Sequence, residues 1–359
     1  MKKICFFSGN IDRTGGTERV GVLIANALVE KNYKISILSY ENGMNPVFKV
    51  HPNINLYSLH MERNKDFFSR KIMPYVKLNN FLKENPQDIL VNIDVLLCIY
   101  SIPIKFLRKI KIIAWEHFNF TVDNGVKNRK RARKLAAYFS DLIVVLTKKD
   151  LDIYKSNLNI KKRITNIYNP TLPIMNNMID FQEKENIVLT IGRLTEQKNF
   201  KELITIWSEL GKRTIGWKLI ICGTGDQENA LKKQIEDNKL DNIVMEGFCQ
   251  NIDEYYKKAK IFVMTSIFEG FPMVLVESQT YGLPIVSYDC LTGPSEIIID
   301  NKNGFLIPMN DRSLFKDKLI KLLNNKELRD IFSISAFNDC NRFKIDNIVK
   351  KWEDEINNL

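Results

Sequence analysis

Residues 261–281 read IFVMTSIFEGFPMVLVESQTY, and this stretch decides the fold class. Its opening run is apolar and has the length of a buried strand. Pro272 then stands where the first turn of a helix tolerates proline, and residues 273–281 are predicted to be helical. The stretch is therefore a strand, a turn that carries Glu269, and a helix that carries Glu277.

Glu269 and Glu277 are two carboxylates placed eight residues apart after a buried strand. In an open parallel sheet, the turns at the carboxyl ends of the strands are where ligands bind. A carboxylate accepts hydrogen bonds from paired hydroxyl groups such as those of a ribose or a hexose. The pattern therefore indicates a site that holds the two ends of an extended polyhydroxy ligand.

The chain has 359 residues, 45% of them apolar, which is enough for two domains with full cores. Apolar runs of strand length alternate with helical patterns in both halves, which predicts an α/β fold of two Rossmann-like doubly wound domains. Asn169-Pro170 marks the linker. We predict domains at residues 1–168 and 169–340, followed by a last helix within 341–359.

A charged turn follows the first predicted strand of the second half. It reads Gly192-Arg-Leu-Thr-Glu-Gln-Lys198. Arg193 can bind a diphosphate through two parallel hydrogen bonds, and Lys198 acts as a compact positive charge. Gly223, after the next strand, permits close approach of the backbone to a ligand.

Two features of the first half are candidates for the same kind of site. Gly15-Gly16 precedes a predicted helix, whose free N–H groups can bind an anion. The alternative is an ordinary tight turn, and we favour the anion site. His117 follows the predicted strand 111–115 at its carboxyl end, where sites form, although a lone histidine is usually structural.

Together these motifs resemble those of the GT-B retaining glycosyltransferase family 4, strongly over residues 187–308 and more weakly over 13–28 and 112–119. The resemblance implies a nucleotide sugar held mainly by the second domain, with the acceptor bound by the first. It also implies that the last helix, within 341–359, crosses back to the first domain. It implies that Glu277 binds the ribose and that Glu269, with the backbone of 270–273, orients the donor sugar. The implied catalytic residues are His117, Arg193, Lys198 and Glu269. The implied donor-binding residues are Gly15, Gly16, Arg193, Lys198, Gly223, Phe248, Cys249, Glu269, Gly270, Phe271, Pro272, Met273, Val274 and Glu277.

The resemblance also implies retention of the anomeric configuration, a UDP-sugar donor and no cofactor or metal. The segment Thr292-Gly-Pro-Ser-Glu296 resembles transferases of surface-polysaccharide and lipid-linked oligosaccharide assembly, so we expect a hexose or N-acetylhexosamine to be added to a glycan linked to a polyprenyl diphosphate. Asp150-Leu-Asp152 matches the Asp-x-Asp of metal-dependent transferases, but its place at a predicted helix start favours helix N-terminal charge.

The charge of the chain is concentrated in one half. Residues 1–168 carry a net charge of +15 and the remainder −4, which gives the overall +11. A one-sided basic surplus indicates a polyanionic partner, such as an anionic membrane, nucleic acid or a phosphorylated acceptor. Residues 63–84 and 127–134 are the basic candidates for membrane contact. The alternative interpretation of 63–84 is a core helix with a basic face, and that of 127–134 is a charged face in contact with solvent.

Other functions remain open at this level. A GT-B epimerase or phosphorylase would use a similar cleft, although phosphorylases are much longer. A nucleic-acid-binding protein would use the basic half, but recognisable binding motifs and stacking aromatics are missing, so we expect no nucleic acid partner. An inactive scaffold would not be expected to keep Arg193, Lys198, Glu269 and Glu277. Scattered cysteines and the lack of a long apolar run predict a cytoplasmic protein, peripheral at most on the inner face of the membrane.

Overall fold

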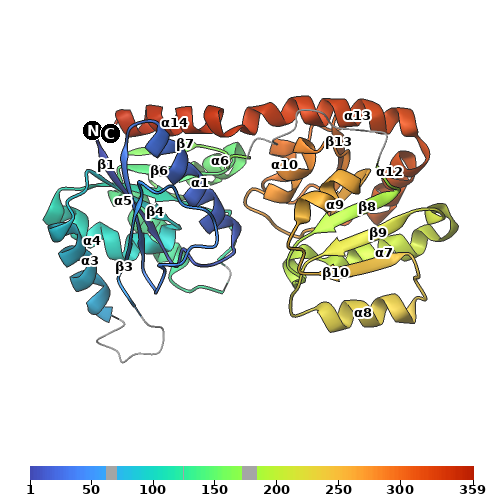
Figure 1. The fold of residues 1–359 in the computed structure, drawn as a ribbon, viewed down its shortest axis with the longest axis horizontal. Helices are drawn as coiled ribbons and strands as arrows, with labels where there is room; N and C mark the ends of the chain where they lie inside the picture. The colour runs from blue at the N-terminus through green and yellow to red at the C-terminus, as the bar shows by residue number, and fades with distance from the viewer. Residues whose placement is uncertain (62–70, 124, 172–183) are drawn as a thin grey trace. The chain divides into compact units, whose positions relative to one another are not determined.

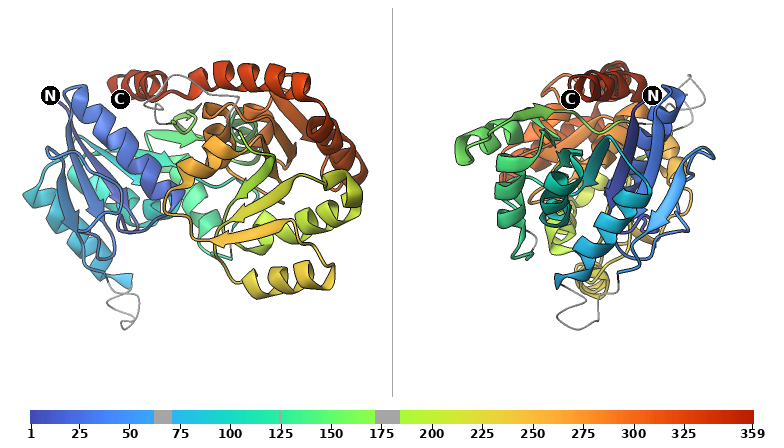
Figure 2. Two further views of the ribbon diagram at one scale, coloured as in Figure 1. Left: turned by 45° about the vertical axis from the view of Figure 1, so that its right-hand side comes forward. Right: turned by 90° about the vertical axis from the view of Figure 1, so that its left-hand side faces the viewer.

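The computed structural model describes residues 1–61, 71–123, 125–171 and 184–359. The chain divides into two compact units (Figure 1). The first unit consists of Met1–Pro170 together with Lys344–Leu359, and the second consists of Thr171–Phe343. In each unit a parallel sheet is flanked by helices, so the predicted α/β class with two doubly wound sheets is confirmed (Figure 2).

The first unit contains a seven-stranded parallel sheet in the order β3-β2-β1-β4-β5-β6-β7. The strand order reverses between β1 and β4, which is the kind of switch point at which open α/β sheets bind ligands. The strands are β1 (Lys3–Ser8), β2 (Lys34–Ser39), β3 (Asn55–Ser58), β4 (Ile89–Ile93), β5 (Lys111–Trp115), β6 (Leu142–Val145) and β7 (Arg163–Asn166). Its helices are α1 (Gly16–Glu30), α3 (Met73–Glu84), α4 (Cys98–Arg108), α5 (Arg129–Phe139), α6 (Lys148–Asn157) and α14 (Ile345–Asn357), with the short 3-10 helix η1 (Val95–Leu97).

Two segments of this unit show local detail that follows from their residues. Residues 95–108 form two helical elements, η1 and α4. Pro74 lies in the first turn of α3, which begins at Met73, and no N–H is needed there. The start of the basic segment 63–84 lies outside the described residues.

The second unit contains a six-stranded parallel sheet in the order β10-β9-β8-β11-β12-β13. The strands are β8 (Ile187–Ile191), β9 (Lys218–Cys222), β10 (Ile243–Gly247), β11 (Ile261–Met264), β12 (Ile285–Tyr288) and β13 (Gly304–Ile307). The helices are α7 (Phe200–Leu210), α8 (Glu228–Asp237), α9 (Ile252–Lys258), α10 (Met273–Thr280), α11 (Pro294–Ile297), α12 (Arg312–Asn324) and α13 (Lys326–Asp339), with 3-10 helices η2 (Glu196–Lys198), η3 (Gly211–Thr214) and η4 (Cys340–Phe343).

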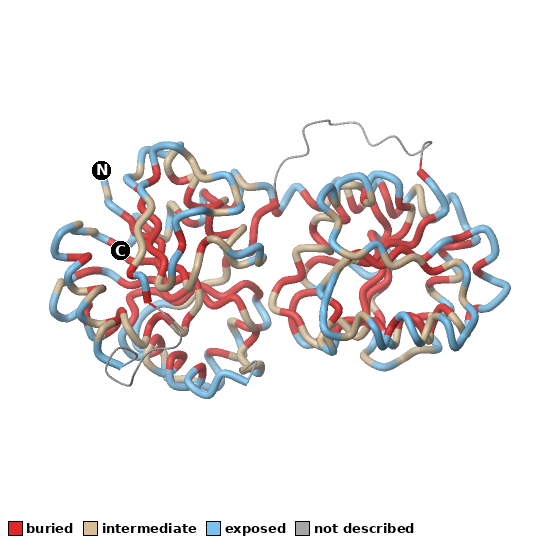
Figure 3. Tube along the Cα trace, turned by 60° about the horizontal axis from the view of Figure 1, so that its bottom comes forward, coloured by how far each residue is buried: buried red, intermediate tan, exposed pale blue. Residues whose placement is uncertain are grey.

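The buried residues concentrate on the strands of both sheets and on the helix faces turned toward them (Figure 3). The strands are apolar on both faces because helices cover both faces of a parallel sheet. Five of the six cysteines are buried within these cores and Cys249 is half-buried. Among the described residues, no helix is both long enough and apolar enough to cross a membrane.

The last helix, α14, is part of the first unit. It packs against α1, at the opposite end of the sequence (Figure 1). Trp352 of α14 is fully buried and meets Trp115 at the end of β5, with 4.7 Å between the ring centroids. Burying an aromatic pair of this kind contributes strongly to a core, so α14 is an integral part of this unit.

Candidate active site

Most of the predicted donor-binding residues of the second unit lie at one edge of its sheet. They follow the carboxyl ends of β10, β9, β8 and β11, which are neighbours in the sheet. The chain order separates these segments by up to eighty residues, but parallel pairing brings their loops together. By strand, they are Phe248 and Cys249 after β10, Gly223 after β9, Arg193 and Lys198 after β8, and Glu269, Gly270, Phe271, Pro272, Met273, Val274 and Glu277 after β11.

Lys198 and Glu269 form the central ion pair of this edge. The Nζ atom of Lys198 donates a hydrogen bond to Oε1 of Glu269 at 2.6 Å, and both side chains are largely shielded from solvent. A buried carboxylate is costly without a partner, and Lys198 is that partner for Glu269 in the turn. The pair places a positive and a negative group side by side at the sheet edge.

Hydrogen bonds between loops fix the position of this pair. Gln197 donates its Nε2–H to the carbonyl of Phe268 at 2.9 Å, and the N–H of Ile267 donates to the carbonyl of Gln197 at 2.8 Å. The hydroxyl of Thr292, which follows β12, donates to the carbonyl of Glu269 at 2.6 Å. Thr292 was not among the predicted site residues, although its Thr-Gly-Pro motif was noted in the sequence.

Two glycines allow neighbouring loops to approach more closely than a side chain would permit. Gly223 has φ +148°, and a Cβ atom built on it would lie 1.8 Å from the carbonyl oxygen of Gly192. A Cβ on Gly225 would lie 2.3 Å from the carbonyl oxygen of Leu194. These contacts explain chemically why both positions are glycine, and they bring the loop after β9 against the loop that carries Arg193.

The remaining predicted residues of this unit differ in accessibility. Glu277, in the second turn of α10, accepts a hydrogen bond from the Tyr256 hydroxyl at 3.0 Å. Arg193 and Phe248 are exposed and are free to meet a ligand with their side chains. Phe271 is buried against Phe343, with 5.4 Å between ring centroids, so it can serve a ligand only through its backbone.

The first unit places its predicted residues at the carboxyl edge of its own sheet. Gly15 is the N-cap of α1 and Gly16 is the first helical residue, directly after the loop that follows β1. This geometry supplies the free N–H groups that an anion requires. Asp94, at the end of the neighbouring β4, adopts φ +103°, an uncommon conformation for a residue with a side chain.

His117 follows β5 and is held in a mostly buried position. Its side chain lies 4.5 Å from Trp115 between ring centroids, and it is only 8% exposed. Its Nε2 atom has no hydrogen-bond partner among the described residues. Burial, and to a lesser degree the charge of Arg129, lowers the pKa of His117 to about 3, so the imidazole is neutral at physiological pH. A neutral imidazole can give one hydrogen bond and accept one.

The loop that carries His117 is fixed by a buried charge network that the sequence did not predict. Glu116 is fully buried, and its Oε2 accepts hydrogen bonds from Nε of Arg133 and from the Tyr154 hydroxyl, both at 2.8 Å. Arg129 donates to Glu116 at 3.1 Å and forms two hydrogen bonds with Asp94, at 3.0 and 2.9 Å. The predicted solvated or membrane-facing role of 127–134 is therefore wrong for two of its six basic residues, because Arg129 and Arg133 point inward.

Arg133 also binds the backbone of the same loop. Its guanidinium donates to the carbonyls of Phe120 at 2.6 Å, Asn119 at 2.9 Å and Val122 at 3.1 Å. Asp150, in the first turn of α6 as predicted, is more than a helix charge: it accepts a hydrogen bond from the N–H of Phe120 at 2.8 Å, and burial raises its pKa to about 7. The loop is thus attached to two helices.

Two family models match the chain. The model described as Glycosyltransferase Family 4 matches residues 14–171, and that described as Glycosyl transferases group 1 matches residues 175–339. An uncharacterized glycosyltransferase of Haemophilus influenzae is 31% identical over 98% of this chain and 99% of its own length. The chain belongs to glycosyltransferase family 4.

Other relatives of this glycosyltransferase have assigned names. The amylovoran biosynthesis glycosyltransferase AmsD of Erwinia amylovora is 28% identical over 99% of this chain and 100% of its own length. An undecaprenol-diphosphate-linked glycan α-1,4-N-acetyl-D-galactosaminyltransferase of Campylobacter jejuni is 28% identical over 98% and 97%. A structure of S. aureus TarM in complex with UDP has a TM-score of 0.82 at 18% identity, with 99% of each chain covered, and supports the GT-B fold.

Proposed function

We propose that this glycosyltransferase moves a hexose or an N-acetylhexosamine from a UDP-sugar to a growing cell-surface glycan, with retention of configuration and without a metal ion. The observation that carries the proposal is the Lys198–Glu269 ion pair, held at the carboxyl edge of the second sheet beside glycine-lined loops. It provides a cation for a leaving diphosphate and a carboxylate for sugar hydroxyls within one rigid arrangement.

The proposed roles follow the chemistry of each group. Departure of the diphosphate develops negative charge, which Arg193 and Lys198 are suited to meet. Glu269 would orient the donor sugar through its hydroxyls, and Glu277 would accept hydrogen bonds from the ribose. His117 is neutral, so it would hydrogen-bond a sugar hydroxyl rather than act as a cation. In this mechanism the acceptor hydroxyl attacks the anomeric carbon from the same face that the diphosphate leaves. Such an attack requires no nucleophile from the protein.

The proposed acceptor is a glycan linked to a polyprenyl diphosphate, and its support comes from relatives. The C. jejuni relative acts on an undecaprenol-diphosphate-linked glycan by its name, and the E. amylovora relative is named for biosynthesis of the polysaccharide amylovoran. The TarM structure supports the choice of UDP, because its complex contains that nucleotide. An acceptor of this kind lies in a membrane, so the enzyme would work at a membrane surface.

Calorimetric titration with UDP, GDP and a panel of their sugars, with and without EDTA, tests the donor. We expect UDP to bind in the presence of EDTA and to bind about ten- to a hundredfold more weakly to Arg193→Ala, because a charge-assisted hydrogen bond is lost. Glu277→Ala should weaken UDP binding, whereas Lys201→Ala, a change on the outer face of α7, should not. Lack of UDP binding, or its loss with EDTA, would contradict the proposal.

The anomeric configuration of the product, read by NMR, tests retention and separates a transferase from an epimerase.

A further inference from the structure

The carboxylate of Glu277 is held by a side chain to which the proposed reaction gives no role. The hydroxyl oxygen of Tyr256 lies 3.0 Å from Oε2 of Glu277 and 3.4 Å from the carbonyl oxygen of Val274. A hydroxyl group has one hydrogen to donate, and the nearer acceptor is the carboxylate oxygen. The bond between Tyr256 and Glu277 therefore joins α9, which carries the tyrosine, to α10, which carries the glutamate.

The ring of Tyr256 is packed so tightly that its hydroxyl has a fixed position. The residue is 1% exposed. Its ring stacks on that of Tyr281, with 5.1 Å between centroids and an interplanar angle of 5°, and lies 6.0 Å from the ring of Phe262. Rings held between neighbours in a close-packed core have little freedom to move. Because the hydroxyl is attached directly to the ring, it gives the carboxylate a fixed point of contact.

A buried lysine joins the carboxyl ends of the same two helices. Nζ of Lys184 donates to the carbonyl of Ala259 at 3.0 Å and to that of Tyr281 at 3.1 Å, and these are the C-cap residues of α9 and α10. Burial lowers the pKa of Lys184 to about 7, but a neutral amine still has two hydrogens to donate. The two helices are thus connected at two places, and one of these places is Glu277.

The helix that carries Tyr256 also begins beside the segment expected to meet the nucleobase. Phe248 and Cys249 follow β10, and α9 starts at Ile252, three residues after Cys249. Base and ribose are adjacent parts of one nucleoside. α9 is therefore the element that connects the predicted base-binding segment to the carboxylate expected to bind the ribose.

A carboxylate with a fixed orientation can distinguish a ribose from a deoxyribose. The ribose of a nucleotide offers two adjacent hydroxyls, and a carboxylate can accept a hydrogen bond from each when its plane is turned correctly. If the side chain is free to turn, the ligand has to order it, and this ordering weakens binding. Glu277 is half-buried, so a ligand can reach it while Tyr256 holds it from the protein side.

We infer that Tyr256 is a positioning residue that fixes the carboxylate of Glu277 and thereby selects ribonucleotide over deoxyribonucleotide donors. The inference rests on the proposed role of Glu277 in ribose binding. It adds a residue on another helix, and a selectivity, that this role does not include. Because Tyr256 acts only through Glu277, removal of its hydroxyl weakens recognition of the ribose hydroxyls and leaves the contacts to base and diphosphate in place.

Calorimetric titration with UDP and 2′-deoxy-UDP tests the inference, and GDP with 2′-deoxy-GDP is run in parallel so that the result does not depend on the base. The ratio of the two dissociation constants in a pair measures the contribution of the 2′-hydroxyl. We expect the wild-type protein to bind the ribonucleotide about ten- to a hundredfold more tightly. In Tyr256→Phe this ratio should fall about three- to tenfold, with affinity for the deoxynucleotide nearly unchanged.

Tyr288→Phe is the matched control. The Tyr288 hydroxyl donates to Oε1 of Glu202 at 3.1 Å, and Tyr288 is also 1% exposed. The change therefore removes the same kind of bond from the same unit. Thermal unfolding should show similar losses of stability for the two variants, whereas only Tyr256→Phe should lower the ratio. A ratio that falls equally in both variants, or in neither, would overturn the inference.

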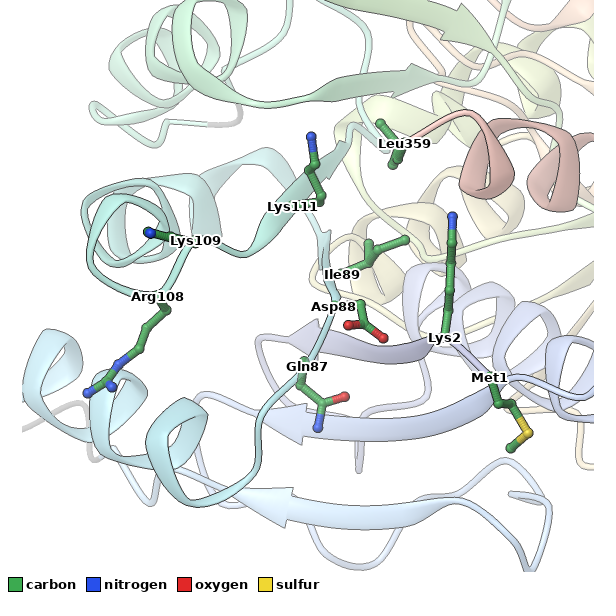
Figure 4. Close-up of a pocket in the computed structure, with 9 residues that line it drawn as sticks. All are labelled: Met1, Lys2, Gln87, Asp88, Ile89, Arg108, Lys109, Lys111 and Leu359. Atoms are coloured by element: carbon green, nitrogen blue, oxygen red, sulfur yellow. The ribbon is translucent and has the colours of Figure 1, made fainter.

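A second control concerns a basic groove of the first unit. The groove has a volume of about 590 Å³, lies at the amino ends of β1, β4 and β5, and is lined in part by Lys109 and Lys111 (Figure 4). A nucleoside diphosphate is an anion, so these lysines attract it without recognising its ribose. Lys109→Gln with Lys111→Gln should leave the ratio unchanged. A fall as large as that in Tyr256→Phe would contradict the assignment of the selectivity to Glu277.

The variant Glu277→Ala separates this inference from the proposed function. It should remove most of the discrimination, and the addition of Tyr256→Phe should then lower the ratio no further, because the two residues act as one unit. If Glu277→Ala leaves the ratio unaltered, the ribose role of Glu277 is wrong and the inference falls with it. If Glu277→Ala removes the discrimination but Tyr256→Phe does not reduce it, only the inference about Tyr256 is overturned.

Discussion

The two units position their loops by different means. In the first unit, the loop after β5 is held by side chains: Arg129 and Arg133 meet Glu116, and Arg133 binds three backbone carbonyls. In the second, the loops after β8 and β9 are held by backbone contact at glycines such as Gly223. The first arrangement is sensitive to charge and the second to volume. The two loops should therefore respond to different substitutions.

Removing Arg133 should have the largest effect. Arg133→Met leaves Glu116 with fewer partners in a buried site, and breaking one side of a buried ion pair costs about 3–5 kcal/mol. We expect loss of amide hydrogen-exchange protection across the first unit, with the second unit unchanged. Arg131→Met, two residues away on the exposed face of α5, should change stability by less than about 0.5 kcal/mol. Equal effects of the two changes would contradict an internal role for Arg133.

Next in size is the loss of the Lys198–Glu269 pair. Lys198→Met should lower kcat by about 10²–10³, because a fixed cation is removed from the developing diphosphate charge. Glu269→Gln keeps the shape of the side chain and should lower kcat as well, while the first unit keeps its exchange protection. Steady-state kinetics with the UDP-sugar identified by titration would measure both. A variant that raises KM alone would indicate that the pair contributes only to binding.

A methyl group at Gly223 should have a smaller effect, confined to the second unit. Gly223→Ala would place Cβ against the carbonyl oxygen of Gly192, so the loop must move. We expect a cost of about 1–3 kcal/mol and weaker donor binding. Gly216→Ala is the matched control, because Gly216 also has positive φ but a Cβ there meets nothing within 4 Å. Donor binding should fall in the first variant and persist in the second.

The last prediction concerns the dependence of stability on pH. The pKa of His117 is lowered to about 3 in the folded protein, so the unfolded chain takes up the proton first as the pH falls below about 6.5. Stability is therefore lost on acidification between these two values, by about 1.4 kcal/mol per pH unit. Asp150, with its pKa raised to about 7, acts in the opposite direction.

Comparison with His117→Asn isolates this contribution. Asp150 is present in both proteins, so its effect cancels in the difference between them. As the pH falls from 6.5 toward 4, we expect the free energy of unfolding to decrease more in the wild-type protein than in the variant. A constant difference over this range would show that His117 is protonated as readily in the folded chain as in the unfolded one.

The sequence predicted the fold because its main signals are local. The apolar run from Ile261, the proline at 272 and the helix that follows define a strand–turn–helix unit, and parallel pairing then brings Glu269 close to Lys198. Local patterns could not predict the direction of Arg129 and Arg133 within a run of six basic residues. Their burial depends on Glu116, which lies on another element. Thr292 was likewise recognisable as part of a motif, but its hydrogen bond to the turn at Glu269 depends on the packing of β12 beside β11.

The position of α14 has a consequence for how the protein is made. Residues 171–343 form a continuous segment, so the second unit can fold as soon as that segment has left the ribosome. The first unit, although its strands are synthesised earlier, lacks Trp352 against Trp115 until residues 345–357 emerge. The half that is translated first is therefore the half that is completed last, and during synthesis its face beside α1 stays open to chaperones.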